Sequence, residues 1–318
     1  MKIITEANDL QGKRVLVRVD WNVVKPASTR GSSSTRGGEG KVMSLFRINS
    51  SLPTIEFLQK AGAQVILATH LEEGSIEVLK PFVPSGVELL PNLRENSGEV
   101  ENTEEFAKTL ASQADVYVNE AFSVSHRKHA SIVGVPKLLP SYAGIRFALE
   151  VEKLSKVFNP PHPFLAILSG TKIETKLPLV EKLLLSADSI FLGGPMAKSA
   201  SEMSLADNPK ISLPSGDLTA LDSNDETLGR LRSKISEAKF VVWNGPLGQY
   251  ETGYTKYTDE LAQALAEAKT EVIVGGGDTL VTVERLNLLD KFSFVSTAGG
   301  AMLDFLANET LPGIEVLK

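Results

Sequence analysis

The sequence predicts an α/β fold of two Rossmann-like domains, each built on a parallel sheet, with a joining helix and a deep cleft between them. The length of 318 residues corresponds to two domains of roughly 150 residues each. Short runs of apolar residues alternate with helix-like segments along almost the whole chain. Most of these runs are continuously apolar, which is typical of parallel strands that are buried on both faces. Repeated strand–helix units of this kind place helices on both faces of each sheet.

Eight segments are expected to be strands, in chain order 14–20, 64–70, 115–122, 164–170, 188–194, 239–245, 271–278 and 292–300. Amphipathic stretches such as ENTEEFAKTLASQ, TKLPLVEKLLLSA and YTDELAQALAEAK are expected to be the helices between them. Residues 142–157 are interpreted as one helix, and the breaker NPPHP follows at 159–163, which favours a connector between domains. Residues 25–41 are rich in Ser, Gly and Arg and predict a flexible basic loop.

Composition excludes several classes of protein. The chain has no cysteine, so disulfides, thiolate metal sites and redox thiols are excluded. A net charge of −6 argues against a nucleic-acid partner. No stretch approaches the roughly 20 apolar residues of a membrane span, and the N-terminus lacks the apolar region of a signal peptide, so we expect a cytoplasmic protein with no membrane partner.

The residues that follow the predicted strands differ between the two halves. Ligands of open parallel sheets bind beyond the carboxyl ends of the strands. In the first half these ends carry polar and charged residues, namely Asp20, Asn22, His70 and the run HRKH at 126–129. In the second half they carry Ser169–Lys172, Gly193-Gly194, WNGP at 243–246, GGGDT at 275–279 and STAGGA at 296–301.

The glycine clusters favour an anion site. A glycine turn that leads into a helix lets backbone N–H groups approach an anion, and the helix dipole favours negative charge there. Asp278 and Thr279 are expected at a helix start, where they could meet Mg²⁺ and phosphate oxygens. The chain contains neither G-x-x-x-x-G-K-[ST] nor G-x-G-x-x-G, so a nucleotide would be held by another kind of loop. Ordinary tight strand–helix connections remain the alternative for any single cluster.

Taken in order, RVDWN, VNEAF followed by HRKHAS, WNGPLGQYE, GGGDT and STAGGA resemble phosphoglycerate kinase, and the likeness runs from GKRVLVRVDWNV to LPGIEVL. The resemblance implies transfer of a phosphoryl group between 1,3-bisphosphoglycerate and ADP, giving 3-phosphoglycerate and ATP, with Mg²⁺, in a monomer whose domains close to bring the substrates in line. It also implies a 3-phosphoglycerate domain at 1–148, to which a tail at about 306–318 returns, and a nucleotide domain at 149–305.

The resemblance also assigns residues to roles. The glycerate side would use Asp20, Asn22, Arg47, His70, Arg94 and Arg127. The nucleotide side would use Lys172, Lys176, Gly193, Gly194, Asn244, Pro246, Glu251, Gly276, Gly277, Asp278 and Thr279, with Asp278 as the metal ligand. Arg47, Lys172, Gly299 and Gly300 would act on the transferring phosphoryl group.

The chain departs from the family pattern in three ways. Glu73 stands where the family has an arginine, and we hypothesise that Arg30, Arg36 or Lys128 compensates for this reversal of charge. The region 195–242 is short, which predicts weak and unselective nucleotide binding. Ser169, Pro195 and Ala298 replace family glycines, and Ala298 is costly only if its φ is positive. Two alternatives therefore stay open: a degenerate homologue without turnover, and a kinase for another small carboxylate.

Overall fold

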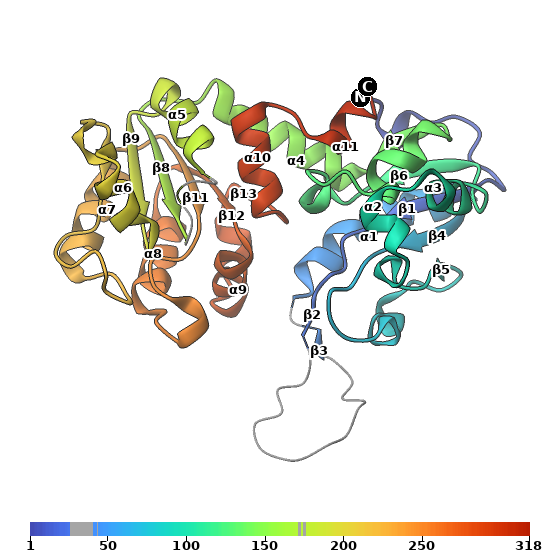
Figure 1. Ribbon diagram of the computed structural model, residues 1–318, viewed down its shortest axis with the longest axis horizontal. Helices are drawn as coiled ribbons and strands as arrows, with labels where there is room; N and C mark the ends of the chain where they lie inside the picture. The colour runs from blue at the N-terminus through green and yellow to red at the C-terminus, as the bar shows by residue number, and fades with distance from the viewer. Residues whose placement is uncertain (26–40, 43, 171–172, 174–175) are drawn as a thin grey trace, which may run out of the picture. The chain divides into compact units, whose positions relative to one another are not determined.

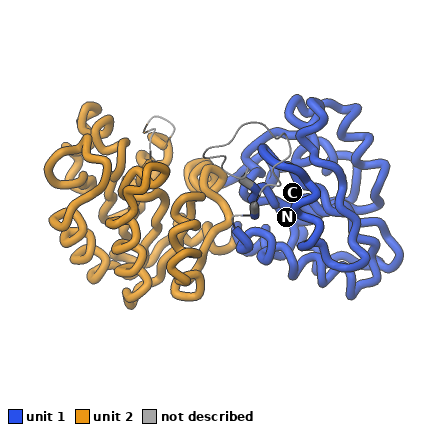
Figure 2. Tube along the Cα trace, turned by 90° about the horizontal axis from the view of Figure 1, so that it is seen from below, with its two compact units in different colours: residues 1–151, 310–318 blue, residues 152–309 orange. Residues whose placement is uncertain are grey.

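The protein is described by a computed structural model over residues 1–25, 41–42, 44–170, 173 and 176–318 (Figure 1). The described chain divides into two compact units, which Figure 2 shows in different colours. Unit 1 comprises residues 1–151 and 310–318, and unit 2 comprises residues 152–309. Residues 26–40 of the predicted basic loop, which include Arg30 and Arg36, lie outside the described residues, as does Lys172.

The main sheet of unit 1 is parallel, with the strand order β5-β4-β1-β6-β7. Its strands are β1 (Arg14–Arg18), β4 (Gln64–Ala68), β5 (Glu88–Leu89), β6 (Val116–Asn119) and β7 (Ser141–Ala143). Arg18 pairs with Ala68 on one side and with Asn119 on the other, so the three central strands end level with one another. The loops that follow these strands therefore begin at one edge of the sheet, which we call the carboxyl edge of unit 1.

Alternate side chains of β1 divide the core of unit 1 between the two faces of the sheet, as the two-residue period of a strand requires. Val15 and Val17 belong to the hydrophobic cluster that contains Ile55 and Leu58 of one helix. Leu16 belongs to the cluster on the other face. The helices of unit 1 are α1 (Phe46–Lys60), α2 (Ser97–Glu101), α3 (Glu104–Ala111), α4 (Ile145–Ser155), which runs on into unit 2, and α11 (Pro312–Glu315).

Unit 2 holds a second parallel sheet, with the strand order β10-β9-β8-β11-β12-β13. Its strands are β8 (Phe164–Ser169), β9 (Ser189–Gly193), β10 (Ile211–Ser212), β11 (Phe240–Asn244), β12 (Glu271–Gly275) and β13 (Phe294–Val295). Its helices are α5 (Leu177–Ser186), α6 (Met196–Glu202), α7 (Asp225–Glu237), α8 (Lys256–Glu267), α9 (Gly277–Arg285) and α10 (Gly300–Asn308). Figure 1 shows helices on both faces of this sheet.

The predicted fold class of two parallel-sheet α/β domains is confirmed, and each of the eight predicted segments contains a strand. Three strands of two or three residues, β5, β7 and β10, were not predicted because such short pairs have no visible period. The antiparallel pair of β2 (Val24–Lys25) and β3 (Lys41–Val42) was also missed. The prediction of one helix over 142–157 was wrong at both ends: residues 141–143 form β7, and a 3₁₀ turn at Lys156–Phe158 follows α4.

The first turn of α4 is held by a buried carboxylate. Glu120 follows β6, and its Oε1 and Oε2 atoms accept hydrogen bonds from the backbone N–H groups of Arg146 (3.1 Å) and Phe147 (3.0 Å). The hydroxyl of Thr54 also donates to Glu120, at 2.6 Å. Burial raises the pKa of Glu120 to about 7. The start of α4 is thereby fixed to the carboxyl edge of unit 1.

The C-terminal residues 310–318 belong to unit 1, so both ends of the chain lie there (Figure 1). The N–H of Gly313 donates to the carbonyl oxygen of Ser125 at 2.9 Å. Val316 packs against a small hydrophobic cluster that includes Ala121 and Ile132. The tail therefore supports the segment 121–133, which follows β6. Within the described residues, every helix is too short or too polar to cross a membrane.

Candidate active site

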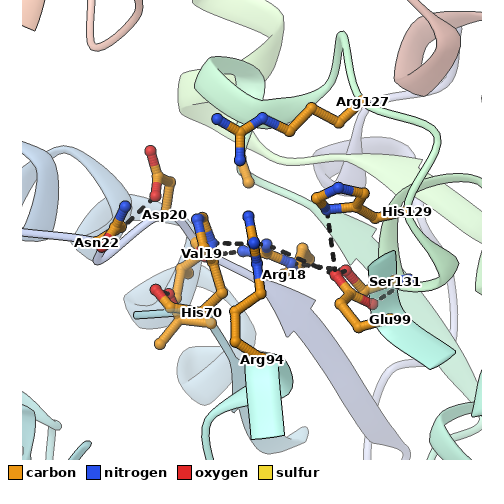
Figure 3. Close-up of polar contacts among 12 residues, drawn as sticks. Arg18, Val19, Asp20, Asn22, His70, Arg94, Glu99, Arg127, His129 and Ser131 are labelled. Carbon is orange, nitrogen blue, oxygen red and sulfur yellow. Dashed lines mark hydrogen bonds and ion pairs between the residues drawn. The ribbon is translucent and has the colours of Figure 1, made fainter. Parts of the chain in front are cut away.

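Five basic side chains gather at the carboxyl edge of unit 1, and we call them the basic cluster: Arg18, Arg47, His70, Arg94 and Arg127. Figure 3 labels all of them except Arg47. Arg18 ends β1, Arg47 lies in the first turn of α1, and His70 follows β4. Arg94 lies in a 3₁₀ turn at Leu93–Glu95, and Arg127 lies in the loop after β6. Figure 3 shows Arg94 and Arg127 reaching toward the same region from different loops.

Asp20 is the acidic partner of the catalytic candidate Arg47. The Arg47 Nη1 atom lies 3.2 Å from Asp20 Oδ2, and the hydroxyl of Ser123 donates to the same oxygen. The backbone N–H of Asn22 donates to Asp20 Oδ1 at 3.3 Å. Burial alone would raise the pKa of Asp20, but the charge of Arg47, then that of His70 and the Ser123 hydrogen bond, outweigh burial and lower this pKa to about 2. Asp20 is thus a fixed negative charge that orients Arg47.

His70 is buried, and burial first, then the charge of Arg18, lowers its pKa to about 3. Its Nδ1 atom lies 3.1 Å from Arg18 Nη2, so the neutral ring accepts there and carries its proton on Nε2. The Nε2 atom is buried and has no hydrogen-bond partner among the described residues. His70 therefore offers one N–H donor to a ligand.

Arg18 was not among the residues predicted for the site, although a charged residue within an apolar strand was a visible signal. Its side chain is fully buried, and Nε donates to Ser131 Oγ at 2.8 Å. Its Nη2 atom lies 4.0 Å from an oxygen of Glu99, which is also fully buried and accepts from Ser131. This arrangement satisfies the buried guanidinium and aims it at His70.

Glu72, and not Glu73, is the acidic residue that pairs with Arg94 and Arg127 of the basic cluster. Its Oε1 atom lies 3.7 Å from Arg94 Nη2 and 3.5 Å from Arg127 Nη1. Glu73 is exposed, and the ion pairs of Arg94 and Arg127 run to Glu72 and not to Glu73. The prediction that Glu73 stands at the family arginine position is not tested by these contacts, which show that Glu72 is the acid paired with Arg94 and Arg127. Lys128 is exposed, and the ion pairs of Glu72 run to the two arginines instead.

The glycine turns of unit 2 meet at the carboxyl edge of its sheet. A Cβ at Gly194 would lie 3.5 Å from both Gly170 N and Pro246 O, and a Cβ at Gly299 would lie 3.3 Å from Gly276 Cα. The N–H of Gly276 donates to Ala298 O at 3.0 Å, which joins the turns before α9 and α10. The N-termini of these two helices, which begin at Gly277 and Gly300, therefore lie side by side, and the positive ends of both helix dipoles favour an anion there.

Two residues predicted as ligands in unit 2 also make contacts within the protein. Thr279 is fully buried, and its hydroxyl accepts the N–H of Gly245 at 3.0 Å. The hydroxyl proton is not used in this hydrogen bond, and the predicted contact with phosphates stays a prediction. Asn244 is buried, with its Nδ2 atom 3.8 Å from the sulfur of Met302. Gly193 is buried beside Ser169. Thr279, Asn244 and Gly193 thus all pack within the carboxyl edge of the sheet of unit 2 and help to hold its turns in place.

Three further predicted residues of unit 2, Asp278, Glu251 and Lys176, differ in how far they are exposed to solvent. Asp278 is exposed in the first turn of α9, and Glu251 is exposed in a 3₁₀ turn at Tyr250–Thr252. Lys176 is partly buried at the start of α5, its amino group donates to Ser169 O, and burial lowers its pKa to about 8. The described residues contain no group of three or more His, Cys, Asp or Glu that could hold a metal ion. A single carboxylate at Asp278 suits Mg²⁺, which proteins often hold through one or two carboxylates plus phosphate oxygens.

The shortened region of unit 2 still reaches the loop after β11. The N–H of Gln249 donates to Leu221 O at 2.7 Å, and a Cβ at Gly248 would lie 2.4 Å from an oxygen of Asp222. Residues 221 and 222, which begin the segment LDSNDET, thus pack against residues 248 and 249. Ala298 does not have a positive φ, so it adopts its position without the strain that the sequence left open.

Comparison with known proteins identifies relatives along the whole chain. The family model described as phosphoglycerate kinase matches residues 4–83, 75–206 and 198–309. The phosphoglycerate kinase of Leptospira biflexa is 32% identical over 398 aligned positions, covering 99% of this chain and 98% of that protein. The phosphoglycerate kinase of Methylorubrum populi is 33% identical over 405 positions, covering 100% and 98%. The alignment with the Leptospira protein is 80 positions longer than the 318-residue chain. This chain is therefore the shorter of the two because it has gaps within the alignment.

Two solved structures resemble the fold. Phosphoglycerate kinase from Coxiella burnetii superposes with a TM-score of 0.77 at 29% identity, covering 99% of this chain and 98% of that one. The enzyme from Pyrococcus horikoshii gives a TM-score of 0.82 at 24% identity, covering 100% and 98%, and shares the fold.

Proposed function

The chain belongs to the phosphoglycerate kinase family, and we propose that its unit 1 binds the phosphoglycerate and its unit 2 the nucleotide. The reaction is the reversible transfer of a phosphoryl group between 1,3-bisphosphoglycerate and ADP, a step of glycolysis that gives 3-phosphoglycerate and ATP. The observation that carries the placement is the contrast between the two carboxyl edges: one gathers basic side chains, and the other gathers glycine turns and helix N-termini.

On the glycerate side, Arg94 and Arg127 are proposed to take the phosphate, because arginine donors match the oxygens of a phosphate group. The Arg94 Nε atom is buried and has no hydrogen-bond partner among the described residues, so it is available to a ligand. His70 would donate its Nε2 proton to a second oxygen. Asp20 and Asn22 stabilise the loops after β1 and β4, because Asp20 accepts the N–H of Asn22 and Asn22 accepts the N–H of Glu72.

The transfer itself needs positioning and charge neutralisation. The leaving carboxylate of an acyl phosphate is a weak base, so the protein needs neither a nucleophile nor a general base. Negative charge spreads over three phosphoryl oxygens in the transition state, and fixed positive charges and N–H groups stabilise it. Arg47, Lys172 and the N–H groups at Gly299 and Gly300 are proposed for this role, once closure brings the two ligands in line.

Asp278 would hold Mg²⁺, and the ion would supply neutralisation of the nucleotide phosphates. Lys176, Gly276, Gly277 and Thr279 are proposed to form the phosphate side of the nucleotide site. Gly193 and Gly194 would border the adenine, with Asn244, Pro246 and Glu251 toward the base and ribose. We also propose a monomer, since one chain supplies both edges, and a cytoplasmic location, where glycolysis takes place. Size-exclusion chromatography with light scattering checks the monomer.

The pH dependence of nucleotide use is expected to report Lys176. Because burial lowers the pKa of this amino group to about 8, its charge is present below pH 8 and is lost as pH rises through 8. The kcat/KM for MgATP should then fall up to tenfold per pH unit above about 8. Lys176→Arg keeps its charge and should move the fall beyond about pH 9.

Lys198→Arg is the matched control, since Lys198 is an exposed lysine of α6 paired with Glu202. Its profile should equal that of the parent protein. An unchanged profile in Lys176→Arg would show that Lys176 does not bind the phosphates in its charged form.

A coupled assay tests the function as a whole. ADP-forming turnover with 3-phosphoglycerate, ATP and Mg²⁺ is followed through reduction of the 1,3-bisphosphoglycerate product by NADH. Turnover that depends on 3-phosphoglycerate supports the proposal. Its absence, with no response to 3-phosphoglycerate in a binding assay, would favour a degenerate homologue. Turnover with another small carboxylate alone would favour a different carboxylate kinase.

A further inference from the structure

The carboxylate of Glu72 lies between two arginines of the basic cluster. One oxygen, Oε1, is 3.7 Å from Arg94 Nη2 and 3.5 Å from Arg127 Nη1. The two arginines come from separate segments of the chain, and the carboxylate of Glu72 makes an ion pair with each of them. The carboxylate of Glu72 therefore occupies the position between two guanidinium groups where an anionic ligand would bind.

The backbone of this acid is fixed, while its side chain is not. The N–H of Glu72 donates to Asn22 Oδ1 at 3.1 Å. Asn92 binds Leu71 on both sides, accepting its N–H at 2.9 Å and donating to its carbonyl at 3.0 Å. The Glu72 side chain is 54% exposed, and its ion-pair distances exceed the 2.7–2.9 Å of a strong charge-assisted hydrogen bond. The carboxylate can thus turn into solvent without moving the loop.

We propose that Glu72 is a built-in competitor for the phosphate group of the substrate. The inference rests on the proposed function, which assigns Arg94 and Arg127 to that phosphate. A phosphorylated ligand must displace the Glu72 carboxylate, so the affinity is reduced by the fraction of molecules in which the ion pairs are closed. A phosphate dianion carries more charge than a carboxylate and wins the exchange, whereas a ligand that offers only a carboxylate does not. Glu72 therefore lowers affinity and sharpens selection for phosphorylated ligands.

Glu72→Gln removes the charge and keeps the shape of the side chain. Isothermal titration calorimetry of the whole protein with 3-phosphoglycerate should give a Kd about three- to thirty-fold lower than that of the parent, since two exposed ion pairs no longer have to be broken. The Kd for inorganic phosphate, measured in a separate titration, should also be lower in Glu72→Gln than in the parent. Glu73→Gln, which removes the same charge one residue away, should change either Kd less than about two-fold.

Three results would overturn the proposal. An unchanged or higher Kd in Glu72→Gln would mean that Glu72 orders the arginines for binding. An equal gain in Glu73→Gln would mean that only the general charge of the loop matters. A gain for 3-phosphoglycerate without one for inorganic phosphate would place the action of Glu72 away from the phosphate.

Arg94→Ala and Arg127→Ala separate this proposal from the proposed function. If both leave the Kd for 3-phosphoglycerate unchanged, the phosphate is bound elsewhere and the placement in unit 1 fails. If they weaken binding while Glu72→Gln brings no gain, the placement stands and only the competitor role fails. Circular dichroism and thermal unfolding of each variant confirm that the fold is kept.

Discussion

Replacing Arg47 by alanine is expected to lower kcat by about 10³-fold or more, with a much smaller change in the KM for ATP. An arginine that neutralises the transition state of phosphoryl transfer contributes about 10³–10⁵ in rate. Arg47 is the cluster member that the buried Asp20 orients, through the 3.2 Å pair described above. Steady-state kinetics in the coupled assay measure the loss. A kcat within about tenfold of the parent would remove Arg47 from the catalytic group.

The control must separate catalysis from folding, because Arg47→Ala leaves a buried carboxylate without its main partner. The lowered pKa of Asp20 stabilises the fold above the ordinary aspartate pKa, and this stability is lost as pH falls toward about 2. Arg47→Ala should shrink that contribution and lower the unfolding free energy at neutral pH. The double variant Asp20→Asn/Arg47→Ala should regain stability while staying inactive. Recovered activity in the double variant would contradict a direct role for Arg47.

Gly245→Ala is expected to lower the free energy of unfolding by about 2–6 kcal/mol and to abolish nucleotide binding. Gly245 follows β11 with φ +100°, a region that alanine rarely adopts, and its Cβ would lie 2.2 Å from the carbonyl oxygen of Ser169. That neighbour is backbone, so it cannot rotate away. The N–H of Gly245 also donates to Thr279, which links β11 to the start of α9. Urea unfolding and titration with MgADP measure the two effects.

Gly229→Ala is the matched control for this substitution. Gly229 lies inside α7, where an added Cβ meets no atom within 4 Å. Its replacement should raise helix propensity and stabilise the protein by up to about 1 kcal/mol. A mild effect of Gly245→Ala, close to that of the control, would mean that the turn after β11 can move aside.

The central strands and the two carboxyl edges could be predicted because they depend on local sequence. A continuous run such as VLV before Asp20, or FLAIL before the turn at 169–170, needs no knowledge of distant residues. The division into a basic edge and a glycine edge follows from what stands after each strand. The short strands β5 and β10 could not be found, since two residues show no period and their pairing depends on neighbours elsewhere in the chain.

The details of the site depended on contacts between distant residues. The backbone that carries Glu72 is held by distant residues, because Asn22 Oδ1 accepts the N–H of Glu72 and Asn92 Oδ1 accepts the N–H of Leu71. Arg18 can be buried at the basic cluster because Glu99 and Ser131, far along the chain, supply its ion pair and a hydrogen bond. Thr279 stood in the expected motif, but the fold turned its hydroxyl to Gly245. Motifs identified the edge of each sheet, and contacts between distant residues determine how the side chains at that edge are oriented.

The return of the C-terminal tail to unit 1 also sets an order in time. The segment 121–133, which carries Arg127, is supported by Gly313 and Val316. These residues are synthesised after all of unit 2, although the strands of unit 1 are made early in synthesis. The segment 121–133 therefore cannot complete its packing until residues 310–318 have been synthesised. A truncated or stalled chain would hold every member of the basic cluster and still lack the support that closes their loop.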